Sequence, residues 1–161
     1  MMKIINTPYL RLDFDILEKN IHLMQTIANK SNLKLMPHAK THKCAEIAKL
    51  LINSGAEGIS VAKFEEAIFF MNNGIKLIKI CYPIISEEKI TILLKKAKIL
   101  NVNIFFVIDS YEGFNQLKKV SKKLNSLVSV YIEIDVGFNR CGLHYENPIL
   151  MTLAKKIKKS K

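Results

Sequence analysis

A lysine between two histidines is the arrangement in this sequence that most suggests chemistry. Lys40 lies in the segment Pro37-His38-Ala39-Lys40-Thr41-His42-Lys43 and follows the apolar run 33–36. A lysine at the end of a strand is held in one place, and desolvation or a nearby positive charge can leave its amine deprotonated and nucleophilic. Such an amine can form an imine with a carbonyl compound. The alternative is a solvated lysine at a strand end, because lysines are abundant throughout the chain.

The same two histidines raise the question of a metal site. His38 and His42 are four residues apart, a spacing that could bind a metal ion on one face of a helix. Pro37 and the strand-like pattern before it argue against a helix at this point. The three cysteines, Cys44, Cys81 and Cys141, are widely separated and form no Cys-x-x-Cys pair. We therefore expect no metal ligands in this chain and three reduced thiols.

The formal net charge of +11 makes nucleic-acid binding a class to consider. The lysines, however, are scattered over the polar faces of the predicted helices, and no aromatic residues interleave with them to stack on bases. No apolar run approaches the ~20 residues of a membrane span, and the start of the sequence has no signal-peptide pattern. We expect a cytoplasmic protein that binds neither nucleic acid nor membranes.

Strand-like and helix-like segments alternate along the chain, which predicts parallel strands joined by right-handed helical crossovers. A leading helix, capped by Asp13 or Asp15, precedes five strand–helix units. The predicted strands are 33–38, 58–62, 77–82, 103–108 and 128–134, and the predicted helices between and after them are 42–53, 63–73, one from Ser86, 110–125 and one from Pro148.

Two α/β architectures fit this alternation, an open doubly wound sheet and an eight-stranded barrel. The sequence has neither a Gly-x-Gly-x-x-Gly segment nor a phosphate-binding loop, so a nucleotide-binding sheet has no support. A complete barrel typically needs ~250 residues, whereas this chain has 161. We expect a partial TIM (β/α)8 barrel of about five parallel strand–helix units after one leading helix.

Several segments, taken in order, resemble the N-terminal barrel of pyridoxal-phosphate enzymes of the alanine racemase fold type. They are Thr7 to Leu10, Pro37 to Lys43, Gly55 to Ala62 with Glu65-Glu66-Ala67, and Ile132 to Leu143. Within that fold type the chain is most similar to the D-threonine aldolase and D-serine dehydratase-like branch. The His-Ala-Lys-Thr-His-Lys segment is specific to this branch, whereas Asp-x-Gly-x-x-Arg-x-Gly is shared more widely.

The resemblance implies that Lys40 binds pyridoxal 5′-phosphate covalently, as an imine. Lys43 is the competing lysine, but the pattern places it in the following helix, away from the strand end. His38 shares the strand face with Lys40 and could tune the lysine, line the pocket or be a packed core residue. His42 is expected to be structural or exposed.

Arg140 follows the fifth predicted strand. By resemblance to the racemases it hydrogen-bonds the cofactor's phenolic oxygen, and its fixed charge suits a group that gains from staying ionised. The alternative is a surface ion pair with Asp135 or Glu133. Tyr82 and Asp109 end two other predicted strands and are candidate pocket residues, because strand ends face the mouth of a barrel.

The resemblance also implies parts that this sequence does not contain. Relatives continue through the rest of the barrel, which binds the cofactor phosphate, and into a C-terminal β domain that supplies divalent-metal ligands and a substrate contact in a homodimer. Residues 1–161 correspond to the N-terminal portion of the barrel. We expect a truncated chain, or one half of a split enzyme that needs a complementary chain, and no complete active site in the chain alone.

The function implied by the resemblance is that of a pyridoxal-phosphate-dependent lyase acting on small D-3-hydroxy amino acids. Retro-aldol cleavage and dehydration both fit, and the sequence does not choose between them. An amino-acid racemase fragment is a less favoured alternative, because racemisation needs a second base from the absent domain. A non-catalytic pyridoxal-phosphate homeostasis barrel and an inert fragment are the others.

Overall fold

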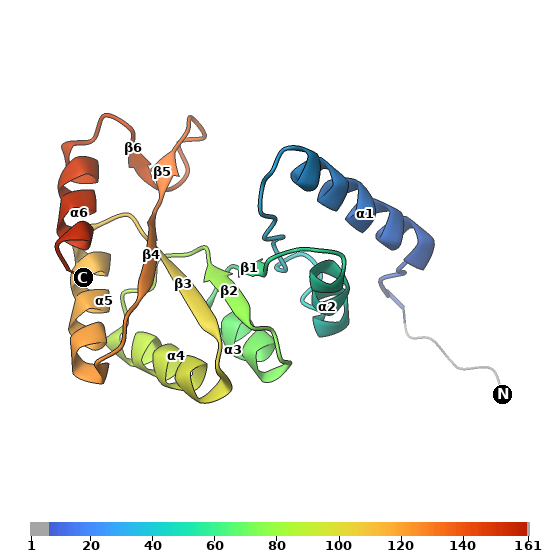
Figure 1. The fold of residues 1–161 in the computed structure, drawn as a ribbon, viewed down its shortest axis with the longest axis horizontal. Coiled ribbons are helices and arrows are strands. Elements are labelled where there is room, and N and C mark those ends of the chain that lie inside the picture. Colours follow the sequence, from blue (N-terminus) through green and yellow to red (C-terminus); the bar gives the residue numbers. More distant parts are fainter. Residues whose placement is uncertain (1–6, 161) are drawn as a thin grey trace.

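Four parallel strands form the main sheet of the protein. In the computed structural model, which describes residues 7–160, the strands β1 (Ile59–Val61), β2 (Leu77–Ile80), β3 (Asn103–Ile108) and β4 (Ser129–Ile132) lie in that order. Each strand pairs in parallel with the next one along the chain. The carboxyl ends of all four strands therefore meet at one edge of the sheet (Figure 1).

In the described part of the chain six helices connect and flank these strands: α1 (Phe14–Lys30), α2 (Ala45–Asn53), α3 (Phe64–Asn72), α4 (Glu87–Leu100), α5 (Tyr111–Leu124) and α6 (Pro148–Lys158). Side-chain oxygens cap four of their amino ends, including that of α1, where Asp13 is one of the two predicted caps. Asp13 accepts from Ile16 N, Ser86 from Lys89 N, Ser110 from Gly113 N and Asn147 from Ile149 N. No helix within residues 7–160 combines the length and the apolar character needed to cross a bilayer.

The hydrophobic core lies between the sheet and the helices α3, α4 and α5, which flank it in Figure 1. Alternate strand residues face this layer, and Ile78, Ile80 and Phe106 are at most 1% exposed. Phe70 of α3 and Leu93 of α4 meet them from the helical side, each with no exposed surface. This burial holds the strands in register and so fixes the edge at which they end.

The opposite face of the sheet is less covered. Phe105 and Tyr131 lie on it with ring centroids 5.4 Å apart, and Tyr131 is 48% exposed. The ammonium of Lys79 lies 5.7 Å above the Tyr131 ring. A curved sheet turns this face inward when it closes into a barrel. The arrangement therefore confirms the predicted α/β fold of a partial barrel, with parallel strands in chain order.

The strand predicted over 33–38 is wrong in extent. This segment makes a single parallel bridge, His38 with Ser60, at the free edge of β1. Pro37 explains why, because it has no N–H to donate at the position where a parallel ladder needs one. The segment still lies alongside β1, because Glu57 N donates to Leu35 O at 2.9 Å. It therefore takes the place of the first of the five predicted strands.

The fifth predicted strand, 128–134, is divided in two. After β4 the backbone of Glu133 donates to Ile108 O and accepts from Leu143 N, both at 2.9 Å. The chain then leaves β3 and continues as β5 (Ile134–Asp135), which pairs with β6 (Leu143–His144). This small second sheet supports the loop that carries Arg140.

Replacing Phe106 by alanine should lower the free energy of unfolding by about 3–5 kcal/mol, the usual cost of deleting a buried phenylalanine ring. Urea denaturation followed by circular dichroism measures the loss. Phe138→Ala is the matched control, because Phe138 is 85% exposed and its ring should contribute less than about 0.5 kcal/mol. Equal losses in the two variants would contradict the position of the core between the sheet and the helices.

Candidate active site

Lys40 lies in a tight turn at the carboxyl edge of the sheet. Ala39, which is fully buried, donates its N–H to Ser60 O and accepts from Lys43 N, both at 2.8 Å. These two bonds fasten the turn to β1 and close it over residues 39–43. The side chain of Lys40 remains exposed, and within residues 7–160 it takes part in no ion pair. The turn therefore presents a fixed lysine whose amine is open to a ligand.

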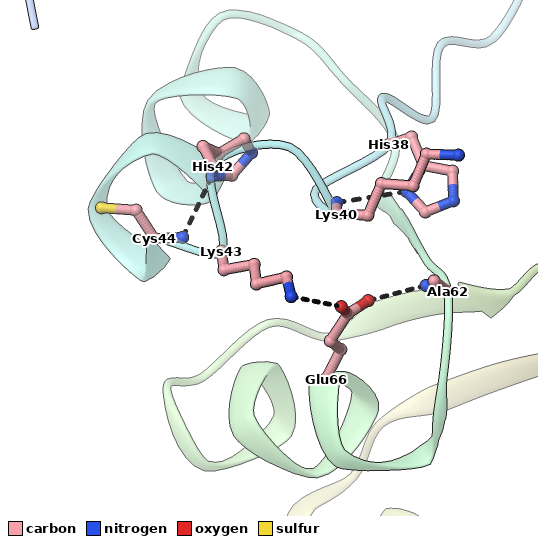
Figure 2. A network of polar contacts seen from close by, with 7 residues as sticks. All are labelled: His38, Lys40, His42, Lys43, Cys44, Ala62 and Glu66. Atoms are coloured by element: carbon pink, nitrogen blue, oxygen red, sulfur yellow. Dashed lines mark hydrogen bonds and ion pairs between the residues drawn. The ribbon is translucent and has the colours of Figure 1, made fainter. Parts of the chain in front are cut away.

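His38 lies beside Lys40, as Figure 2 shows, and the two residues share a hydrogen bond. The backbone N–H of Lys40 donates to His38 Nδ1 at 3.2 Å. Partial burial lowers the pKa of His38 below its ordinary value, and the positive charge of Lys40 lowers it further by a smaller amount. Since Nδ1 accepts a hydrogen bond, the proton of the neutral ring is on Nε2, which is then a donor at this edge.

His42 has a different environment from His38. Its Nδ1 accepts from Cys44 N at 3.1 Å, and its ring meets that of Phe70 edge-on, with centroids 6.5 Å apart. Burial lowers the pKa of His42. These contacts hold the start of α2 against α3, so His42 has a structural position.

The competing lysine, Lys43, does not lie in the following helix. It precedes α2 by two residues, with a left-handed φ of 48°, so that part of the sequence-based prediction is wrong. The cause is the turn, which extends through Lys43, so the helix begins only after its N-cap residue, Cys44. Lys43 Nζ lies 3.5 Å from Oε1 of Glu66, a carboxylate in the first turn of α3 (Figure 2).

Arg140 lies on the exposed loop between β5 and β6. Asp135 shapes this loop, because its Oδ1 accepts from Gly137 N at 2.9 Å and from Asn139 N at 3.2 Å. These hydrogen bonds lower the pKa of the Asp135 carboxyl, and the bond from Gly137 has the largest effect. Gly142 has a φ of +90°, and an added Cβ would lie 2.9 Å from Asp135 N, so no larger residue fits without a shift.

Neither alternative partner engages Arg140 in the part of the chain that the structure describes. Asp135 bonds the loop backbone, and Glu133 Oε1 lies 3.2 Å from Cys141 Sγ. Tyr82, which is 70% exposed, comes shortly after β2, and Asp109 directly follows β3. Tyr82 and Asp109 therefore share the carboxyl edge with Lys40, and among the described residues His38 is the predicted site residue that is hydrogen-bonded to it.

Sequence reasoning assigned no role to Glu66, the buried carboxylate of this edge. The sequence places Glu66 in the first turn of a helix that follows a buried strand. This pattern is too common to single out one glutamate. No group of three or more His, Cys, Asp or Glu side chains that could hold a metal ion occurs between residues 7 and 160. Among the residues that the structure describes, this edge thus offers a lysine and an arginine that take part in no ion pair, beside the imidazole of His38. These groups are suited to an anionic carbonyl compound.

Comparisons with known proteins place this geometry in context. The family described as "Alanine racemase, N-terminal domain" matches residues 12–161. D-threonine aldolase from Arthrobacter sp is 32% identical over 152 residues, which are 94% of this chain and 39% of that protein. 3-hydroxy-D-aspartate aldolase from Paracoccus denitrificans is 30% identical over 140 residues, 86% of this chain and 36% of that protein.

A solved structure agrees with these relatives. That of D-threonine aldolase from Filomicrobium marinum is 31% identical and superposes with a TM-score of 0.85, covering 92% of this chain and 40% of that one. The chain therefore spans about two fifths of the length of the relatives it matches.

The imidazole of His38 should titrate below the ordinary histidine pKa of about 6.5 in an NMR titration of its ring protons. Lys40→Met should raise the pKa of His38, because it removes a positive charge that opposes protonation. Lys34→Met is the control, since Lys34 pairs with Glu57 and is no cause of the His38 shift. A His38 midpoint unchanged by Lys40→Met would contradict the effect of the Lys40 charge on the His38 ring.

The same shift predicts a pH dependence of stability. Between the lowered pKa of folded His38 and its ordinary value the unfolded chain binds more protons, so acidification through this window should favour unfolding. His42 acts in the same direction.

Proposed function

This chain belongs to the family of alanine racemase N-terminal domains, and we propose that it forms the cofactor-bearing part of a pyridoxal-phosphate-dependent lyase acting on D-3-hydroxy amino acids. The observation that carries the proposal is the exposed Lys40 on a turn fastened to the carboxyl edge of the sheet. The identities of 32% and 30% with two aldolases of such substrates support the lyase class.

The residues of this edge fit pyridoxal 5′-phosphate. The cofactor is an anion that carries an aldehyde, so it needs a lysine amine without a carboxylate partner and positive charge nearby. Lys43 and Lys34 are both paired with carboxylates, at Glu66 and Glu57, whereas Lys40 makes no ion pair within residues 7–160. Lys40 is therefore the residue that would hold the cofactor.

Each residue has a role that follows from its chemistry. When bound, the cofactor supplies an electron-accepting ring that stabilises negative charge at the substrate α-carbon. His38 would present its Nε2–H as a hydrogen-bond donor without adding charge beside Lys40. Arg140, held on its loop by Asp135, would keep a positive charge at the same edge at every working pH.

The proposed reaction begins when one bond to the substrate α-carbon breaks. Retro-aldol cleavage breaks the Cα–Cβ bond and transfers the hydroxyl proton to a base, whereas dehydration removes the α-proton and then the β-hydroxyl. The amine of Lys40 would be a base fixed at this edge for either proton. Two named aldolases among the relatives favour the first of these reactions.

Borohydride reduction of the chain in the presence of pyridoxal 5′-phosphate should label Lys40 in preference to every other lysine, because its amine is unpaired and fixed in position. Peptide mapping by mass spectrometry locates the label. Lys40→Met should abolish the specific label, and Lys34→Met, a control on the same segment, should leave it. Label spread evenly over the surface lysines would overturn the proposal.

D-threonine should protect Lys40 from that labelling and L-threonine should not, because a lyase for D-amino acids admits only one configuration at the α-carbon. The reduced and digested chain is mapped after incubation with each enantiomer. Both enantiomers consume free aldehyde equally in solution, so they are compared at equal concentrations, and this readout needs no turnover. Equal protection by both enantiomers would contradict specificity for D-amino acids.

A further inference from the structure

Glu66 is a buried carboxylate that joins two segments of the candidate site. It is 7% exposed, and its Oε2 accepts from Ala62 N at 2.8 Å, directly after β1. Its other oxygen, Oε1, lies 3.5 Å from Lys43 Nζ, in the turn that carries Lys40 (Figure 2). A carboxylate with little access to water needs such partners, because losing one of them leaves its charge uncompensated.

The two lysines of this turn leave it in different directions. Lys43 N donates to Ala39 O at 2.8 Å, and this bond closes the turn between the two lysines. Figure 2 shows the Lys40 side chain running along the His38 ring, while the Lys43 side chain extends toward Glu66. Two lysines three residues apart would otherwise compete for the same electrophile at the same edge.

We propose that Glu66 is the positioning residue that directs an aldehyde to Lys40, by holding the ammonium of Lys43 out of the reaction. This inference rests on the proposed function, in which Lys40 holds the cofactor. Condensation needs a neutral amine, whose lone pair forms a C=N bond while the aldehyde oxygen leaves as water with the two amine protons. The ion pair with Glu66 holds the Lys43 side chain turned away from Lys40, so Lys40 is the lysine of this turn that is left to meet the aldehyde.

Two glutamates in the first turn of α3 give a matched pair of variants. Glu66→Gln removes the charge opposite Lys43 but keeps an oxygen that can accept from Ala62 N. Glu65→Gln removes the same charge one residue earlier, from an exposed carboxylate that pairs with Lys89 at 3.6 Å. Circular dichroism checks that both variants fold.

Competitive labelling with trace acetic anhydride measures the reactivity of each lysine without any cofactor. In the unmodified chain, Lys43 should react more slowly than Lys40. Glu66→Gln should raise the rate of Lys43 relative to Lys40 by about threefold to fivefold, the range expected for loss of a partly exposed ion pair. Glu65→Gln should leave that ratio unchanged. A Lys43 rate that is the same in both variants and the unmodified chain would overturn the inference.

Reduction with borohydride in the presence of pyridoxal 5′-phosphate then tests the direction of the aldehyde. The share of label on Lys43 should rise in Glu66→Gln and stay low in Glu65→Gln. If acetylation changes as expected but reduction shows no preference for Lys40, the proposed function is overturned and the role of Glu66 is not. The two failures are therefore distinguishable.

Salt provides a test that needs no variant. At about 1 M NaCl the screening length is roughly 3 Å, so the ion pair with Glu66 weakens and the ratio of Lys43 to Lys40 acetylation should rise in the unmodified chain. A ratio that does not respond to salt would overturn the inference even if Glu66→Gln fails to fold.

Discussion

Ser60, at the centre of β1, makes the contacts on which the candidate site depends. Its N–H donates to Pro37 O and its carbonyl accepts from Ala39 N, both at 2.8 Å, while its hydroxyl donates to Met36 O at 3.0 Å. The residue is 2% exposed, and buried polar groups of this kind must be paired. One strand residue thus uses its N–H, its carbonyl and its hydroxyl proton to bind the segment that leads to Lys40. Without these bonds the lysine would lie on a loop with no fixed relation to the sheet.

Much of this arrangement follows from local signals in the sequence. Asp13, Ser86, Ser110 and Pro148 mark helix starts, and apolar strands between them require parallel pairing. The extent of the first strand does not follow from such signals. Its apolar residues suggest a full strand, but the lost N–H of Pro37 reduces its pairing with β1 to one bridge.

Contacts between distant segments were less accessible from the sequence than the elements were. Lys43 and Glu66 are 23 positions apart, and their pairing depends on a turn that delays the start of α2 and on the first turn of α3. A pattern of residue types shows neither the direction of a side chain nor its burial. Sequence reasoning could therefore select Lys40 at a strand end, while it misplaced Lys43 and gave Glu66 no role.

The charge of the chain explains why selection between lysines must be local. With 25 Lys and Arg residues against 14 Asp and Glu, a positive field surrounds many amines at once and favours no single one. Only a short-range contact separates two lysines three residues apart. Glu66 supplies that contact from a buried position, to a Lys43 side chain that is 59% exposed. Lys40 differs from Lys43 because it has no carboxylate partner in the described part of the chain. It lies instead beside the neutral imidazole of His38, on the backbone of a tight turn.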